Sequence, residues 1–112
     1  MTEARPATGL SVSALIRRTE VEGGSAMVLA KGDPTAGAIL LLLADRGQPV
    51  GMLERVWIFD GGFGLEPVGP ADLQLPGAAS DYIARRRRSD PDLWAVEIDH
   101  PDALQLARDC LC

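Results

Sequence analysis

Hydrophobic residues recur along the chain at two spacings, and these spacings predict its helices and strands. Apolar residues three or four positions apart are typical of an amphipathic helix, and short apolar runs are typical of strands. The predicted order is helix, strand, strand, strand, helix, strand, and a weaker helical pattern over 102–110 allows a short terminal helix. The six ranges are 12–22, 25–31, 38–44, 50–59, 78–89 and 93–99.

Both predicted helices have a side for the core and recognisable ends. In the first helix, Ser11 is the expected N-cap, and Gly23 with Gly24 ends the helix because glycine adopts the left-handed conformation at low cost. The second helix is expected to stop at Asp90, because a residue before proline, here Pro91, avoids the helical region. The side chains expected to face the core are Val12, Leu15, Ile16, Thr19, Ala79, Tyr82 and Ile83.

The second predicted strand differs from the others because it has no polar face. Residues 38–44 are all apolar, and such a strand is usually covered on both sides. A central position in the sheet explains this pattern, and a subunit interface on one face is the alternative. The other strands alternate, so that Met52 and Leu53 are expected on opposite faces, as are Leu93 and Trp94.

The connections between these elements predict a two-layer α+β domain. Three strands joined by short turns are expected to pair as an antiparallel meander, and the second helix is a crossover that returns the last strand to the same sheet. We therefore expect a mainly antiparallel four-stranded sheet with two helices on one face. Residues 1–9 are expected to be a loose leader before a single domain over 10–112, and 60–77, rich in glycine and proline, a long loop that is functional or mobile.

The composition narrows the class of protein. With 112 residues, of which 46% are hydrophobic and 24% charged, the chain fits one folded domain. Its longest apolar run, 38–44, is far shorter than the roughly 20 residues that span a bilayer. The N-terminus lacks the apolar core of a signal peptide, so a cytoplasmic protein without a membrane partner is expected. A net charge of −5 disfavours a surface that binds nucleic acid throughout.

Few residues are available for metal or redox chemistry. His100 is the only histidine, and Cys110 and Cys112 are the only cysteines. Structural zinc sites usually combine several Cys and His ligands, which disfavours such a site here. The cysteines are expected to be free thiols in a reducing compartment, either incidental or with a role in binding a soft metal. No cofactor is expected.

Two parts of the chain resemble a known family of small bacterial proteins. The first is the segment Asp90 to Asp99, preceded by Tyr82 to Arg85. The second is Val12 to Arg18 with Gly23, followed by Gly32 to Ala38. Together they resemble the family catalogued as domain of unknown function 1491. The resemblance implies a single-domain cytoplasmic protein, and it implies no substrate, cofactor or catalytic residue because the family has none established.

Four carboxylates lie within ten residues around the last predicted strand. Glu97 and Asp99 share a strand face, roughly 7 Å apart, and with Asp92 they are candidate ligands for Mg²⁺ or Mn²⁺, which prefer oxygen. A metal-dependent hydrolase or nuclease is therefore one hypothesis. The element order is similar to the core of restriction-endonuclease-like nucleases, but Asp99 stands where their motif has lysine. In the alternative interpretation Asp90 and Asp92 are turn residues around Pro91, and the strand carboxylates are solvated or paired with arginine.

The strongest run of charge is Arg85, Arg86, Arg87 and Arg88. Consecutive helical residues point about 100° apart, so the four arginines surround the helix end, where the helix dipole favours cations. Neutralisation by nearby carboxylates is one interpretation, and an anion or RNA-backbone contact is the other. The carboxylates considered are Asp81, Asp90, Asp92 and Glu97.

No pattern typical of catalysis is found, so no catalytic residue is assigned. The glycine-rich segment 61–64 lacks the spacing and the lysine of a phosphate loop, and His100 next to Pro101 is interpreted as part of a turn. The leading hypothesis is a non-catalytic interaction domain, with a second copy of the chain as a candidate partner. Metal-dependent hydrolysis and weak nucleic-acid binding through Arg85–Arg88 are the alternatives.

Overall fold

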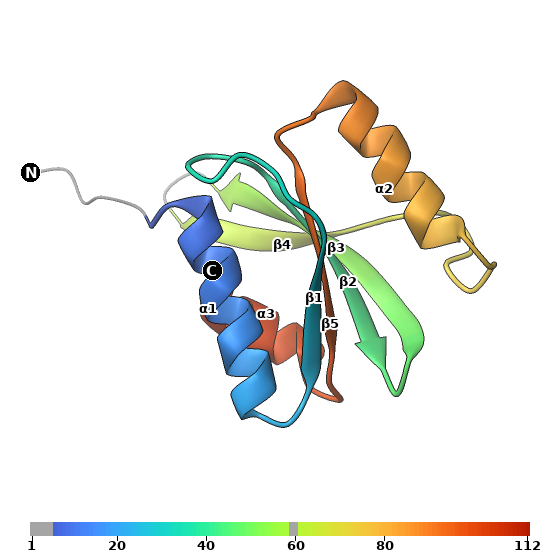
Figure 1. Ribbon diagram of the computed structural model, residues 1–112, viewed down its shortest axis with the longest axis horizontal. Helices are drawn as coiled ribbons and strands as arrows, with labels where there is room; N and C mark the ends of the chain where they lie inside the picture. Colours follow the sequence, from blue (N-terminus) through green and yellow to red (C-terminus); the bar gives the residue numbers. More distant parts are fainter. Residues whose placement is uncertain (1–5, 59–60) are drawn as a thin grey trace, which may run out of the picture.

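The computed structural model describes residues 6–58 and 61–112, and within them the chain forms three helices and one five-stranded sheet (Figure 1). The helices are α1 (Thr8–Val21), α2 (Ala78–Ser89) and α3 (Ala103–Leu111). The strands are β1 (Ser25–Ala30), β2 (Ile39–Asp45), β3 (Gln48–Ile58), β4 (Gly62–Val68) and β5 (Trp94–Asp99). The α+β class is confirmed. The structure has one strand and one helix more than the four strands and two helices expected.

The sheet is mixed, and its order is β1-β5-β2-β3-β4. β5 is parallel to β2, while β1 with β5, β2 with β3 and β3 with β4 are antiparallel. The prediction that the first three strands form a meander is therefore wrong, because β5 lies between β1 and β2. The meander instead joins β2, β3 and β4. Residues 31–38 cross the start of β5 to connect β1 to β2, whereas a tight turn at Arg46 and Gly47 (φ 53° and 78°) joins β2 to β3.

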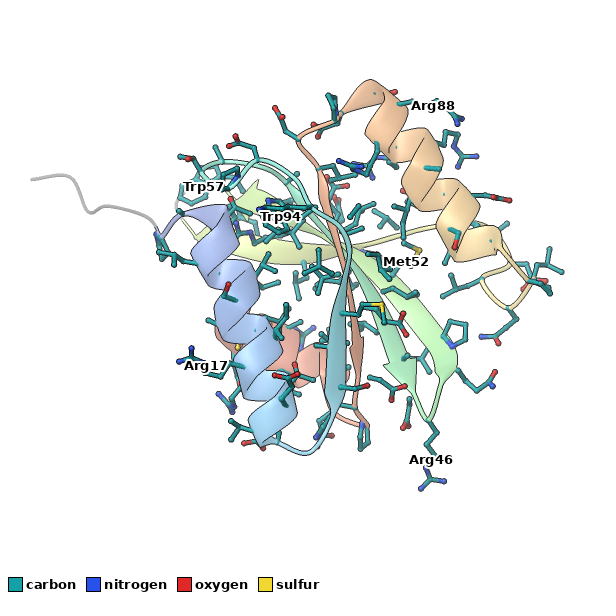
Figure 2. The ribbon with its side chains drawn as sticks, in the orientation of Figure 1. Arg17, Arg46, Met52, Trp57, Arg88 and Trp94 are labelled. Carbon is teal, nitrogen blue, oxygen red and sulfur yellow. The ribbon has the colours of Figure 1, made fainter. Side chains whose placement is uncertain are left out.

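The helices cover both faces of the sheet. α1 and α3 pack against one face and α2 against the other (Figure 1). The prediction that the two helices share one face is therefore wrong. Figure 2 shows the consequence for two side chains, since Trp94 lies towards α1 and Met52 towards α2.

Both faces of β2 are apolar, and helices cover each of them. Leu41 faces α1 and α3, Leu40 faces α2, and neither side chain is exposed to solvent. The central position predicted for this strand is confirmed, and its two faces are covered within one chain. β5 lies beside it, and the predicted alternation is confirmed: Trp94 faces α1, while Ala95, and Leu93 just before the strand, face α2.

β4 was not expected, because its sequence is unusual for a strand. It contains two glycines and Pro67, and proline cannot donate a hydrogen bond to a neighbouring strand. An edge strand tolerates proline, since one of its sides has no partner, and β4 lies at the sheet edge. The expected loop over 60–77 is therefore wrong in its first half. Phe59 and Asp60, which belonged to the predicted third strand and loop, lie outside the described residues.

The N-terminal helix is longer than its apolar pattern indicates. α1 begins at Thr8, its N-cap is Ala7, and Ser11 is a buried helical residue, so the predicted Ser11 cap is wrong. Thr8 and Gly9, expected in a leader over 1–9, lie in the first turn, while residues 1–5 of that leader lie outside the described part of the chain. The predicted end is confirmed, as Gly23 has a φ of 90°.

Candidate functional site at the β1 edge

β1 is an edge strand without a charged residue. Its sequence is Ser25-Ala26-Met27-Val28-Leu29-Ala30, and only its β5 side is paired. Met27 is 60% exposed, and Val28 and Leu29 are each 39% exposed. Free strand edges are places where another strand can add, and proteins usually protect them with charges, proline or a cover. The register shift between Val28 and Ala30 is the one irregularity within this strand's pairing.

The other edge of the sheet carries two of these protective features. β4 contains Glu66 and Pro67, both exposed. A charge is costly to bury against a second sheet, and proline removes a donor that a new strand needs. The two edges of this sheet therefore differ in their ability to accept another strand, and β1 is the more accessible.

A groove lies between β1 and α2 on one face of the sheet. Its volume is about 530 Å³. Leu29, Ala30, Ile83 and Ala84 form its apolar part, and Arg88 is among the polar residues that line it. Ser80 also lines a neighbouring hollow of about 270 Å³, to which the 73–77 segment contributes. The edge strand and the groove thus form one surface, which we call the β1 edge surface.

Two of the four consecutive arginines on α2 stabilise the fold. Arg86 forms an ion pair with Glu54 at 2.9 Å and donates a hydrogen bond to the Tyr82 hydroxyl at 3.2 Å. The hydrogen bond to Glu54 is the main reason why the pKa of Arg86 is raised. Arg87 donates to the carbonyl oxygens of Leu93, Lys31 and Pro91 at 3.0–3.1 Å. The prediction that nearby acids neutralise these arginines is wrong for Arg86, whose partner comes from β3.

The other two arginines are exposed. Arg85 lies 5.4 Å from the centre of the Tyr82 ring, and Arg88, at the end of the helix (Figure 2), borders the groove beside Leu29 and Ala30. The run of arginines therefore does not form a single anion-binding patch. Instead, Arg88 and the exposed Lys31 place positive charge at one end of the β1 edge surface.

The carboxylates proposed as metal ligands have separate surroundings. Asp99 Oδ1 accepts a hydrogen bond from the Arg46 N–H at 3.0 Å, and its Oδ2 accepts one from the Gly47 N–H at 2.8 Å. Glu97 is half-buried beside Met27, and Asp92 is exposed. Among residues 6–58 and 61–112, no group of three or more His, Cys, Asp or Glu side chains is arranged to hold a metal ion.

We predict that Asp99→Ala lowers the free energy of unfolding by about 1–2 kcal/mol, because two turn N–H groups lose a charged acceptor. Urea unfolding measures this change. Asp92→Ala is the control and should change stability by less than about 0.5 kcal/mol, since the Asp92 side chain is exposed. Equal stability of the two variants contradicts the turn role of Asp99, and a Mg²⁺-dependent rise in Tm that both variants lose favours the metal hypothesis.

His100 forms hydrogen bonds in a turn, and of the two cysteines only Cys110 packs against the core. His100 Nδ1 accepts a hydrogen bond from the Asp102 N–H at 2.9 Å, so the proton is on Nε2, which donates to the Glu22 carbonyl at 3.0 Å. The interpretation of His100 as a turn residue is confirmed. Both cysteines are free thiols, and burial raises the pKa of Cys110 and of Cys112. Cys110 lies in α3 and packs against the core.

Comparison with known proteins assigns the family. The family model described as "Protein of unknown function (DUF1491)" matches residues 7–108. A crystal structure of a DUF1491 family protein from Caulobacter crescentus CB15 is 34% identical, with a TM-score of 0.75, over 89% of this chain and 92% of that chain. An NMR structure of a DUF1491 family protein from the same organism is 34% identical, with a TM-score of 0.73, over 90% of this chain and 91% of that one.

A third similar structure comes from another organism. The solution structure of a protein from A. tumefaciens is 30% identical, with a TM-score of 0.69, over 92% of both chains. Comparison with curated proteins gives no match. Within the described residues, every helix is too short or too polar to cross a membrane. From the family match over nearly the whole sequence and the shared fold, the chain belongs to the DUF1491 family, whose function is unknown.

Proposed function

We propose that the protein is a non-catalytic interaction domain that forms a homodimer through its β1 edge. The observation that carries the proposal is the uncharged, apolar and unpaired edge of β1, on a sheet whose other edge has Glu66 and Pro67. Two copies of β1 paired antiparallel about a twofold axis bury Met27 and Leu29 of each copy and join the two sheets into one.

The distribution of charge supports a second copy as the partner. Lys31 and Arg88 lie at the C-terminal end of β1, and Glu97 lies beside Met27, towards the other end. Antiparallel pairing brings the basic end of one copy towards the Glu97 end of the other. Such pairing is attractive at both ends of the twofold interface, because each contact occurs twice.

The decisive measurement is the oligomeric state. Sedimentation velocity of the full chain at tens of micromolar is expected to show a dimer. Met27→Lys should raise the dimer dissociation constant about 100-fold or more. Burying an ammonium group in the interface costs several kcal/mol, the half-buried Glu97 beside it recovers only part of that cost, and 1.4 kcal/mol corresponds to a tenfold change. Met27 is 60% exposed in the single chain, so this substitution leaves the monomer core intact.

Val21→Lys is the matched control, because Val21 is an apolar residue, 74% exposed, at the end of α1 and outside the β1 strand and the groove beside it. This variant should remain dimeric. A wild-type chain that stays monomeric at about 100 µM contradicts the proposal, as does a Met27→Lys variant that dimerises like the wild type. A monomer that binds an acidic extended peptide along β1, in a manner lost in Met27→Lys, would replace the second copy by a different partner.

A further inference from the structure

A second candidate site lies on the opposite face of the sheet, around Arg55. This residue is in β3, paired with Leu65 of β4, and its neighbour two positions earlier, Leu53, packs in the core beneath α1 and α3. Arg55 is 9% exposed. Arginine is rarely buried to this extent without a paired charge, so its surroundings need an explanation.

No carboxylate among the described residues lies within ion-pair distance of Arg55. The ion pairs found there belong to Arg18 and Arg86, whereas the Arg55 guanidinium lies 3.8 Å from the centre of the Phe63 ring. Burial lowers the pKa of Arg55, and a nearby Cys112 thiolate would oppose this effect. A cation–π contact stabilises the charge only in part, because it provides no hydrogen-bond acceptor for the guanidinium N–H groups. No buried side-chain nitrogen among the described residues lacks a partner, so the Arg55 donors that have no protein acceptor remain open to solvent and can be reached by a ligand.

The guanidinium borders a pocket of about 320 Å³. The start of α1 and the loop that crosses β5 form the other walls. These walls contain Thr8 and Thr35, which carry hydroxyl groups, together with small apolar residues such as Ala38. The pocket therefore joins one desolvated cation to both hydrogen-bonding and apolar surface, a combination typical of a small-ligand site.

We propose that this pocket binds a small organic monocarboxylate through Arg55. The planar fork of arginine donates two parallel hydrogen bonds to the two oxygens of a carboxylate, and the charges of one arginine and one carboxylate balance. The alanines and Phe63 contact the apolar part of the ligand. Among the described residues that line it, Arg55 is the one with a positive charge, which disfavours a phosphate dianion. This site is independent of the proposed dimer, whose β1 edge lies elsewhere on the sheet.

Amide NMR of the ¹⁵N-labelled full chain tests the proposal, with sodium benzoate as the first probe. Benzoate is expected to give saturable shifts at Arg55, Ala36 and Gly37, while benzamide, which has the same shape without the charge, gives none. Inorganic phosphate is expected to give no saturable shift. N-acetyl-dialanine with a free C-terminus then tests whether the pocket also accepts the carboxylate of a peptide. Binding of either probe supports the site.

Variants at Arg55 separate binding from a purely structural role. Arg55→Lys should weaken benzoate about tenfold because it keeps the charge but loses the fork, and Arg55→Met should abolish binding while raising the Tm of the unliganded protein. Arg17→Met, at an exposed position of α1, should bind benzoate like the wild type. The absence of a saturable shift in the wild type overturns the proposal, as does binding retained by Arg55→Met. A wild type that gives no saturable benzoate shift, together with a lower Tm of Arg55→Met, would show that Arg55 only packs on Phe63.

Discussion

Leu41→Ala is expected to lower the free energy of unfolding by about 3–4 kcal/mol, one of the largest effects of any single substitution in this chain. Leu41 lies in the central strand, has no solvent exposure, and is flanked in the sheet by Leu53 of β3 and Val96 of β5. Removing its side chain loses transfer free energy and leaves a cavity that rigid neighbours on both sides do not close. Equilibrium unfolding in urea, followed by circular dichroism, measures the change.

Substitutions at Leu40 and Leu10 test whether the loss of stability comes from burial within a single chain. Leu40→Ala, on the α2 face, should cost a similar 2–5 kcal/mol, because that face is also covered within the chain. Leu10→Ala is the control, at a position 67% exposed on α1, and should change stability by less than about 0.5 kcal/mol. If the cost of Leu40→Ala disappears on dilution of the protein, that face is buried by a subunit and the described packing is contradicted.

Gly37→Ala is expected to destabilise the protein by about 3 kcal/mol or more. A Cβ at this position meets the Asp92 carbonyl oxygen far inside van der Waals contact and approaches the Trp94 ring to 2.9 Å. Neither neighbour can move freely. The Asp92 carbonyl accepts a hydrogen bond from the Asp33 N–H at 3.0 Å, and the Trp94 indole donates to the Asp33 carbonyl at 2.7 Å. The substitution therefore separates the loop of residues 31–38 from the start of β5. Overpacking and the loss of buried hydrogen bonds both lower the free energy of unfolding.

Gly51→Ala is the matched control for this substitution. Gly51 lies in β3, has nothing within 4 Å of an added Cβ, and does not have a positive φ. Its replacement by alanine should leave stability unchanged or slightly raised, because alanine restricts the unfolded chain. Thermal unfolding and the near-UV tryptophan signal, to which Trp94 and Trp57 both contribute, report on both variants. A Gly37→Ala protein as stable as Gly51→Ala, with an unchanged tryptophan signal, would contradict the role assigned to the loop of residues 31–38.

The candidate sites were only partly accessible to sequence reasoning. The run Arg85–Arg88 was conspicuous, yet Arg86 and Arg87 hold the fold together, and the partner of Arg86, Glu54, is more than thirty positions away. The exposed edge of β1 was not predicted because the meander placed that strand beside β2. Strand alternation places Arg55 on the same face as Leu53, but alternation alone does not show whether a charged residue on a partly apolar face is buried.

The sequence by itself determined the local elements and the sides that they bury. Helical spacing identified α1 and α2, alternation identified the faces of β3 and β5, and the all-apolar run identified β2 as the centre of the sheet, because these patterns depend only on the geometry of one element. Only the tertiary structure decided that β5 separates β1 from β2, that α2 lies opposite α1, and that, within the described residues, β1 forms an edge and the buried Arg55 has no carboxylate partner. These features depend on contacts between distant residues, whose free energies are set by packing and desolvation rather than by local periodicity.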